Sequence, residues 1–192
     1  MKDGFIRVAA ATPDIHVADP QYNSEQIIEL MEQGSTRGVK VMAFPELCLT
    51  AYTCSDLFLQ ESLLREAKKE LKRILQASKS KDMILFVGMP WMHKGKLYNV
   101  AAVLNRGRIL GIVPKKHLPN YSEFYELRHF NPGMEKVEMT DWEGVQVPMG
   151  MNLLFACRTM PELVLAAELC EDVWVPCPPS ISHALAGADR KS

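Results

Sequence analysis

The sequence lacks the features that define several specialised classes of protein. It carries 22 Lys and Arg against 23 Asp and Glu, so its net charge of −1 offers no electrostatic attraction for nucleic acid or an acidic membrane surface. No apolar run approaches the length of a membrane span. The N-terminus leads into a short apolar segment without a secretory region and cleavage site. We therefore expect a cytoplasmic protein whose partners include neither nucleic acid nor a membrane.

Disulfide, zinc and phosphate-loop signatures are missing too. The five cysteines are an odd number without framework spacing, which indicates free thiols in a reducing compartment. Neither Cys48 with Cys54 nor Cys170 with Cys177 has the close spacing of a zinc pair, and no pair of histidines completes a site. No glycine-rich phosphate loop occurs in the chain. We expect neither a metal nor a cofactor in this part of the protein.

The pattern of apolar residues indicates a layered α/β fold. The chain has 192 residues, of which 47% are hydrophobic, and is long enough for one large core. The expected strands cover 5–11, 39–44, 83–88, 97–104, 108–113 and 163–169, and the expected helices begin near Asn23 or Ser24, span 61–78 and begin at Ser180. The strand–helix–strand order at the start of the chain is typical of a sheet covered by helices.

The segment 163–169 allows two interpretations. Its Leu, Ala and Glu content favours a helix, whereas its short length and its end at Cys170 favour a buried strand, which we expect. Cys170 is followed by two carboxylates and a tryptophan. A cysteine in an apolar stretch is most often a small core residue. Its position at the end of a buried element beside acids makes it a candidate nucleophile as well.

Two other reactive side chains follow strand-like segments, where the sites of layered α/β proteins gather. These are Glu46, after Pro45, and Lys115. Together with Cys170 they suit attack on a carboxamide, because a carboxylate accepts the thiol proton and an ammonium stabilises the oxyanion. We expect these charges to shift one another's pKa values and to favour the thiolate. Glu46 could instead start a helix, and Lys115 beside Lys116 could be a surface pair.

Three segments resemble the catalytic signatures of the nitrilase, or carbon–nitrogen hydrolase, superfamily, in its order and at about its spacing. They are Phe44-Pro45-Glu46-Leu47, Pro114-Lys115-Lys116-His117-Leu118-Pro119 and Leu169-Cys170-Glu171-Asp172. Segments 49–58, 118–126, 170–174 and 183–188 are similar to one branch, the N-terminal glutaminase domains of glutamine-dependent NAD⁺ synthetases. The resemblance runs from about Phe5 to Ala188.

This resemblance implies a fold, a reaction and a set of site residues. The fold would be an α-β-β-α sandwich, usually assembled into homo-oligomers. Cys170 would form a γ-glutamyl thioester with glutamine, Glu46 would be the general base, and Lys115 would stabilise the tetrahedral intermediate. Glu123 would be the second glutamate of the pocket. The residues that would line the glutamine pocket are Tyr52, Tyr121 and Trp174.

The sequence departs from the family pattern after Ala188, where further strands and a polar glutamine-binding segment are expected. The ATP-dependent synthetase domain that would use the ammonia, with ATP and Mg²⁺, to amidate deamido-NAD⁺ is not in this chain. We therefore expect residues 1–192 to form one partial carbon–nitrogen hydrolase domain, incomplete on its C-terminal side. The alternatives are another amidase or a carbamoylase of the superfamily, and an inactive fragment that acts as an assembly module.

Overall fold

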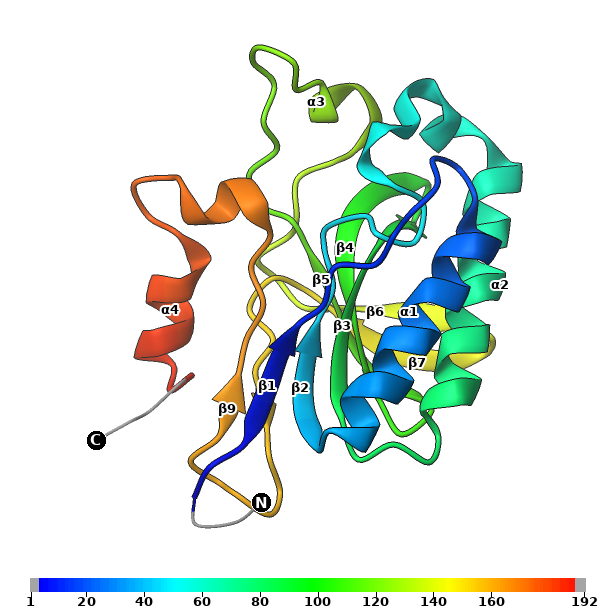
Figure 1. Cartoon of the computed structure of the whole chain (residues 1–192). Helices are drawn as coiled ribbons and strands as arrows, with labels where there is room; N and C mark the ends of the chain where they lie inside the picture. The colour runs from blue at the N-terminus through cyan, green and yellow to red at the C-terminus, as the bar shows by residue number, and fades with distance from the viewer. Residues whose placement is uncertain (1–3, 189–192) are drawn as a thin grey trace.

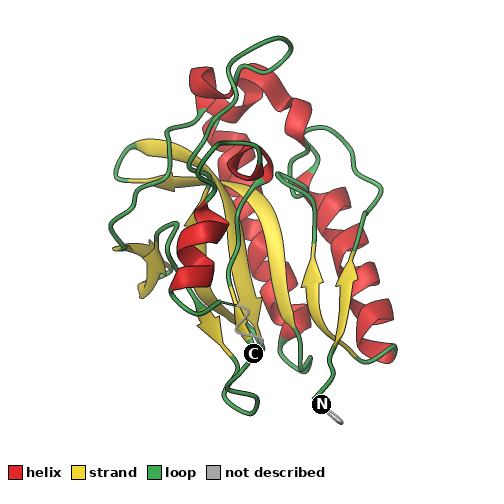
Figure 2. Cartoon of the chain, turned by 90° about the vertical axis from the view of Figure 1, so that its left-hand side faces the viewer, coloured by secondary structure: helices red, strands yellow, loops and turns green. Residues whose placement is uncertain are grey.

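The structure is a computed structural model of the chain, in which residues 4–188 are described (Figures 1 and 2). Its centre is a seven-stranded mixed sheet with the order β1-β2-β3-β4-β5-β7-β6. The strands are β1 (Arg7–Ala10), β2 (Val39–Ala43), β3 (Ile84–His93), β4 (Lys96–Asn105), β5 (Arg108–Pro114), β6 (Glu138–Trp142) and β7 (Val145–Met149). The pairs β1–β2, β2–β3 and β5–β7 are parallel, and the other pairs are antiparallel.

Two long helices, α1 (Pro20–Thr36) and α2 (Glu61–Ser78), cover one face of this sheet (Figure 1). In α2 the buried side chains recur at helical spacing, and Leu71 and Ile74 are fully buried against the sheet. The short helix η1 (Tyr52–Leu59) connects β2 to α2. Parallel strands need crossover connections of this kind, and the two helices supply the crossovers from β1 to β2 and from β2 to β3.

The start of α1 differs from the prediction that Asn23 or Ser24 caps it. The cap is Asp19, whose side chain accepts a hydrogen bond from the backbone N–H of Tyr22 at 3.0 Å, and Pro20 begins the helix. Ser24 instead lies in the second turn of the helix and is buried. Its hydroxyl donates to the buried carboxylate of Glu70 at 2.5 Å and so joins α1 to α2.

The opposite face of the sheet carries the C-terminal part of the chain. A two-stranded ribbon of β8 (Phe155–Ala156) and β9 (Val164–Leu165) is followed by η2 (Cys170–Val173) and α4 (Pro179–Leu185). This part lies across the sheet from α1 and α2 (Figures 1 and 2). No helix within residues 4–188 is long and apolar enough to cross a membrane.

The strand expected over 163–169 is wrong for most of its length, because only Val164 and Leu165 pair as β9. Residues 166–169 continue as an irregular segment that runs to η2. Leu169 is buried with Ala101 and Val113, so its apolar character reflects packing on the sheet. The same segment therefore brings Cys170 to the sheet without being a strand of it.

Candidate active site

Glu46 lies in a tight turn directly after β2. Leu47, the next residue, has a φ of 51°, and the turn lies against Gly88 of β3. A Cβ atom at Gly88 would come within 2.4 Å of both the Pro45 carbonyl oxygen and the Leu47 nitrogen, so any larger residue would push the turn away. Gly88 thus allows the turn that directs the Glu46 carboxylate to Lys115.

Lys115 follows β5 and has a fully buried side chain. Its backbone N–H donates to the Asn99 carbonyl on β4 at 2.9 Å, and its own carbonyl accepts from Gly133 N–H at 2.7 Å. A Cβ atom at Gly133 would lie 2.9 Å from the Lys115 carbonyl oxygen, so this close approach requires glycine. Hydrogen bonds therefore hold both the backbone N–H and the carbonyl of Lys115 in place.

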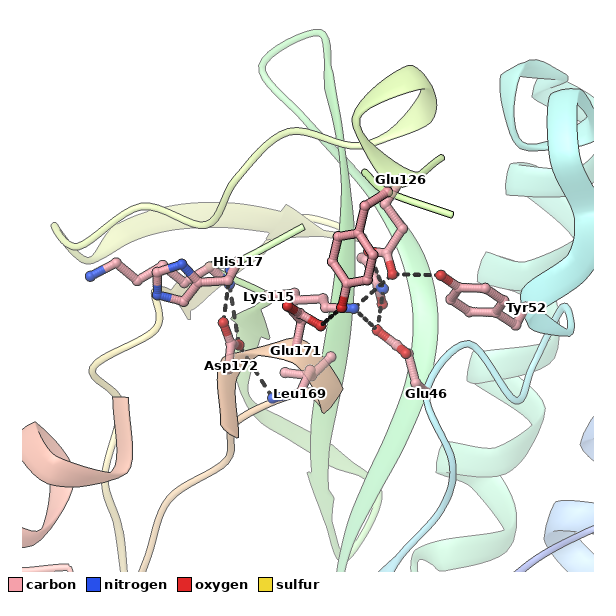
Figure 3. A network of polar contacts seen from close by, with 11 residues as sticks. Glu46, Tyr52, Lys115, His117, Glu126, Leu169, Glu171 and Asp172 are labelled. Atoms are coloured by element: carbon pink, nitrogen blue, oxygen red, sulfur yellow. Dashed lines mark hydrogen bonds and ion pairs between the residues drawn. The ribbon is translucent and has the colours of Figure 1, made fainter. Parts of the chain in front are cut away.

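Four polar side chains meet at this point and form what we call the carboxylate–lysine cluster: Glu46, Asn99, Lys115 and Glu126. Lys115 Nζ lies 2.7 Å from Glu46 Oε1 and 2.7 Å from Glu126 Oε1 (Figure 3). Asn99 Nδ2 donates to Glu46 Oε1 at 2.6 Å and to Glu126 Oε2 at 3.4 Å. The Tyr52 hydroxyl donates to Glu126 Oε1 at 2.8 Å.

The cluster keeps Lys115 charged. Burial alone would lower the pKa of this lysine, but the charges and hydrogen bonds of Glu46 and Glu126 outweigh burial and raise the pKa above its ordinary value. A buried ammonium with two carboxylate partners is well compensated. Lys115 is therefore a fixed cation close to the thiol.

Cys170 is the first residue of η2, and its backbone has a φ of 43°. This left-handed conformation costs a residue with a Cβ atom on the order of 1–2 kcal/mol and persists only where the surroundings impose it. The buried carboxylate of Asp172 supplies that constraint, because it accepts from the backbone N–H groups of His117 at 2.7 Å, Lys116 at 3.2 Å and Leu169 at 3.3 Å (Figure 3). Asp172 therefore ties η2 to the loop that follows Lys115.

Cys170 and Glu46 line the same groove, of about 430 Å³. Its remaining lining is mostly apolar and comes from β2, β3 and the segment 165–169. Cys170 is exposed as a residue and lines this groove, so a small molecule in the groove can reach its thiol. The structure therefore brings the thiol of Cys170, the carboxylate of Glu46 and the buried ammonium of Lys115 to one region of the molecule.

The expectation that the surrounding charges favour the thiolate is wrong. Partial burial of the thiol, followed by the negative charge of Glu46, raises the pKa of Cys170 above its ordinary value. The positive charge of Lys115 lowers the pKa of Cys170, but burial and the negative charges of Glu46, Glu126 and Glu171 together raise it by more. The surroundings of Cys170 therefore favour the thiol over the thiolate.

The second glutamate of the cluster is Glu126, not Glu123. Glu123 is exposed, and no hydrogen bond joins it to Lys115 within residues 4–188; only the backbone and Ser122 hold its carboxylate. Glu126, three residues later, begins the short helix α3 (Glu126–His129) and is 4% exposed. The bidentate ion pair between Arg128 and Asp56 of η1 anchors this helix.

The three aromatic residues expected to line a substrate pocket have different surroundings. The Tyr52 hydroxyl is used by Glu126, so this side chain supports the cluster. Tyr121 is 56% exposed, and its hydroxyl donates at 2.9 Å to Oε2 of Glu171, the residue that follows Cys170. Trp174 is 77% exposed. None of the three lines the groove that Glu46 and Cys170 share, and Tyr121 is joined to this region through its hydrogen bond with Glu171.

Sequence reasoning missed four residues of the site: Asn99, Glu126, Glu171 and Asp172. Glu126 and Glu171 stand in segments that were already singled out, and a short helix starting at Glu126 would have distinguished it from Glu123. Asn99 carried a weaker signal, as a polar residue within an apolar strand. Within residues 4–188 no group of three or more His, Cys, Asp or Glu side chains is arranged to hold a metal ion.

Comparison with known proteins identifies one family. The family model described as carbon-nitrogen hydrolase matches residues 7–189. Glutamine-dependent NAD(+) synthetases from Mycobacterium tuberculosis (strain ATCC 25618 / H37Rv) and Aquifex aeolicus (strain VF5) are 40% and 33% identical to the chain over 185 residues. These matches cover 96% of the chain but only 27% and 29% of the relatives, so the chain spans little more than a quarter of their length.

Solved structures confirm the predicted α/β fold. A glutamine-dependent NAD(+) synthetase from Cytophaga hutchinsonii has a TM-score of 0.80 and 26% identity, over 86% of this chain and 28% of that one. An amidase from Nesterenkonia sp. has a TM-score of 0.67 and 21% identity, over 95% of this chain and 62% of that one. The second likeness concerns the fold alone.

Proposed function

The chain belongs to the carbon–nitrogen hydrolase family, and from this premise we propose that it hydrolyses the side-chain amide of glutamine through a thioester on Cys170. The observation that carries the proposal is the buried ammonium of Lys115, held by two carboxylates beside a thiol that lines one groove with Glu46. Amide hydrolysis by a thiol needs a base, a fixed positive charge and an open nucleophile, and this site offers all three.

In the first half of the reaction, Glu46 would be the general base. Its Oε1 already accepts hydrogen bonds from Lys115 and Asn99, whereas Oε2 accepts none from residues 4–188. Oε2 would take the thiol proton as the Cys170 sulfur bonds to the amide carbon. The oxyanion that forms would be stabilised by Lys115 and by backbone N–H groups. The C–N bond then breaks, and the proton held by Glu46 leaves with ammonia.

In the second half, water would attack the thioester. Glu46 would accept a proton from that water and return it to the sulfur as the C–S bond breaks, which releases glutamate and restores the thiol. Glu126 and Tyr52 would support Lys115 without touching the reacting atoms, since both are committed to hydrogen bonds within the cluster.

Recognition of glutamine is supported by the side chains next to Cys170 and by the names of the relatives. Glu171 adjoins Cys170 in the chain, and its carboxylate, hydrogen-bonded to Tyr121, is suited to the α-ammonium group of an amino acid. Tyr121 and Trp174 would offer apolar surface to the substrate stem. The relatives at 40% and 33% identity are named glutamine-dependent NAD(+) synthetases.

The released ammonia would serve an ATP-dependent synthetase domain that amidates deamido-NAD⁺, with Mg²⁺, in a protein longer than this chain. We propose this use because the relatives are about three to four times as long as the matched region, as the 27% and 29% coverage implies. Assembly into a homo-oligomer and a cytoplasmic location belong to the same proposal. The hydrolase step itself would use no cofactor.

Substrate preference tests the proposed function. Ammonia release from glutamine should exceed release from simple aliphatic amides and from N-carbamoyl amino acids, measured as kcat/KM for each. Equal or faster turnover of the aliphatic amides or carbamoyl compounds would instead identify another amidase or a carbamoylase. Absence of turnover for every compound, with Cys170 unreactive, would identify an inactive assembly module.

A pair of variants distinguishes the two glutamates of the 118–126 segment. Glu126→Gln should lower kcat for ammonia release by about tenfold to a hundredfold, because Lys115 loses a charged hydrogen-bond partner worth about 1.5–3 kcal/mol. Glu123→Gln is the matched control and should leave kcat within a factor of about two, because its carboxylate is exposed. The opposite ranking would restore Glu123 as the second glutamate.

A further inference from the structure

Asn99 lies at the centre of the carboxylate–lysine cluster and has no role in the reaction described above. It is on β4 and is 1% exposed. Its side-chain amide donates to both carboxylates, and its backbone carbonyl accepts from the Lys115 N–H at 2.9 Å. Asn99 is therefore the one described residue that contacts Glu46, Lys115 and Glu126 together.

The two oxygens of Glu46 are unequal because of Asn99. Oε1 accepts from Asn99 Nδ2 at 2.6 Å and from Lys115 Nζ at 2.7 Å, and within residues 4–188 Oε2 accepts no hydrogen bond. In Glu126, by contrast, Oε1 is used by Lys115 and Tyr52, and Oε2 faces Asn99. Two donors on one oxygen prevent the carboxylate of Glu46 from rotating and leave its second oxygen available.

The orientation of the Asn99 amide is determined by these contacts. If the amide were flipped, its carbonyl oxygen would lie about as close to Glu46 Oε1 as the nitrogen does now, and two acceptors would repel each other. The orientation present leaves Asn99 Oδ1 buried without a partner among residues 4–188. An unpaired buried acceptor costs free energy. The amide keeps this orientation because it allows both hydrogen bonds from Nδ2 to the carboxylates.

We propose that Asn99 is a positioning residue that fixes Glu46 with Oε2 toward the thiol of Cys170 and stabilises the ionised form of this base. The inference rests on the roles proposed above for Glu46 and Cys170. A hydrogen bond donated to a carboxylate favours its charged form, and one donated to a single oxygen also sets which lone pairs remain free. Lys115 supplies the charge, but its ammonium is shared between Glu46 and Glu126, whereas the planar amide of Asn99 adds a second, directional donor to Glu46 Oε1.

The pH dependence of Cys170 alkylation tests this role without requiring a glutamine site. Iodoacetamide is the probe, and peptide mass spectrometry follows the rate at Cys170 from acid to alkaline pH. The acid limb is the rise in rate that comes from ionisation of the base, at lower pH than the separate rise that comes from ionisation of the Cys170 thiol itself. Asn99→Leu removes the donor at similar size, and Asn99→Asp keeps the shape but replaces the donor with an acceptor. The acid limb of the profile should move to higher pH by about one unit in Asn99→Leu and by at least as much in Asn99→Asp.

The matched control is Asn105→Leu, on the same strand. Asn105 Nδ2 donates to the Met83 carbonyl at 2.9 Å and has no contact with the cluster, so its loss should leave the acid limb in place. The midpoint is read only over the pH range in which circular dichroism shows the variant to be folded. A variant with reduced stability therefore still gives a valid result.

Three outcomes separate the inference from the proposed function. A shifted limb in both Asn99 variants, with no shift in Asn105→Leu, supports the positioning role. A wild-type midpoint in both Asn99 variants overturns it if Glu46→Gln still abolishes the limb, which leaves the proposed base intact. Survival of the limb in Glu46→Gln overturns the proposed base and, with it, the inference about Asn99.

Discussion

Replacing Lys115 with methionine is expected to lower the free energy of unfolding by about 3–5 kcal/mol. Methionine fills nearly the same space but leaves Glu46 and Glu126 without the ammonium that now lies 2.7 Å from each. Burial makes the loss severe, because Glu126 is only 4% exposed and water cannot take the place of the cation. Urea unfolding followed by circular dichroism measures the change, provided that the slope of the transition stays constant.

Lys116→Met is the control for that experiment. Lys116 adjoins Lys115 in the chain, but its ammonium is partly exposed and lies 3.2 Å from the exposed carboxylate of Glu135. An exposed ion pair contributes on the order of 0–1 kcal/mol, so this variant should be nearly as stable as the wild type. Equal losses in the two variants would show that the Lys115 ion pairs are not the source of the effect.

Replacing Glu46 with glutamine is expected to lower kcat for ammonia release by about a hundredfold to ten-thousandfold. The substitution keeps the shape, and Lys115 keeps Glu126 as a charged partner, so most of the cluster survives. What is lost is the acceptor for the thiol proton, which Cys170 retains at rest because burial and Glu46 itself raise its pKa. Removing that charge makes the thiol easier to ionise but leaves no base to carry its proton to ammonia.

Steady-state ammonia release at saturating glutamine measures this effect. Glu29→Gln, an exposed position on α1, is the control and should leave kcat unchanged. A decrease of less than about tenfold in Glu46→Gln would mean that the thiol proton leaves by another route, and Glu46 would then be a structural member of the cluster.

The elements that could be predicted from sequence are those whose pattern is complete within one segment. The helix over 61–78 matches α2 in both bounds because an apolar face, charged residues and flanking breaks all agree there. The expected strands over 97–104 and 108–113 lie within β4 and β5, and Arg106 and Gly107 form the tight turn between them with positive φ values of 47° and 77°. Local chemistry was sufficient in both cases.

The features that could not be predicted depend on which residues meet in space. Two glutamates stand three residues apart in one loop, and only the burial of Glu126 distinguishes it from Glu123. The pKa of Cys170 depends on a balance between one ammonium and several carboxylates, and a sequence does not give those distances. Asn99 stands in an apolar strand, and its importance arises only when β4 is paired with β5, next to Lys115.

Selective labelling of Cys170 tests the central claim, that this thiol is the nucleophile of a glutamine site. The probe is a glutamine analogue with an electrophilic ketone at the amide position, and intact-mass and peptide analysis give the modified residue. Cys157 is an internal control, because its hydrogen bond with Thr159 lowers the pKa of its thiol and makes it the better target for an unselective reagent.

Our account predicts a single adduct at Cys170, slowed by excess glutamine and by Glu46→Gln, with Cys157 and the exposed Cys177 unmodified. Labelling of Cys157 or Cys177 at the same rate as Cys170, or a Cys170 that stays unmodified, would contradict it.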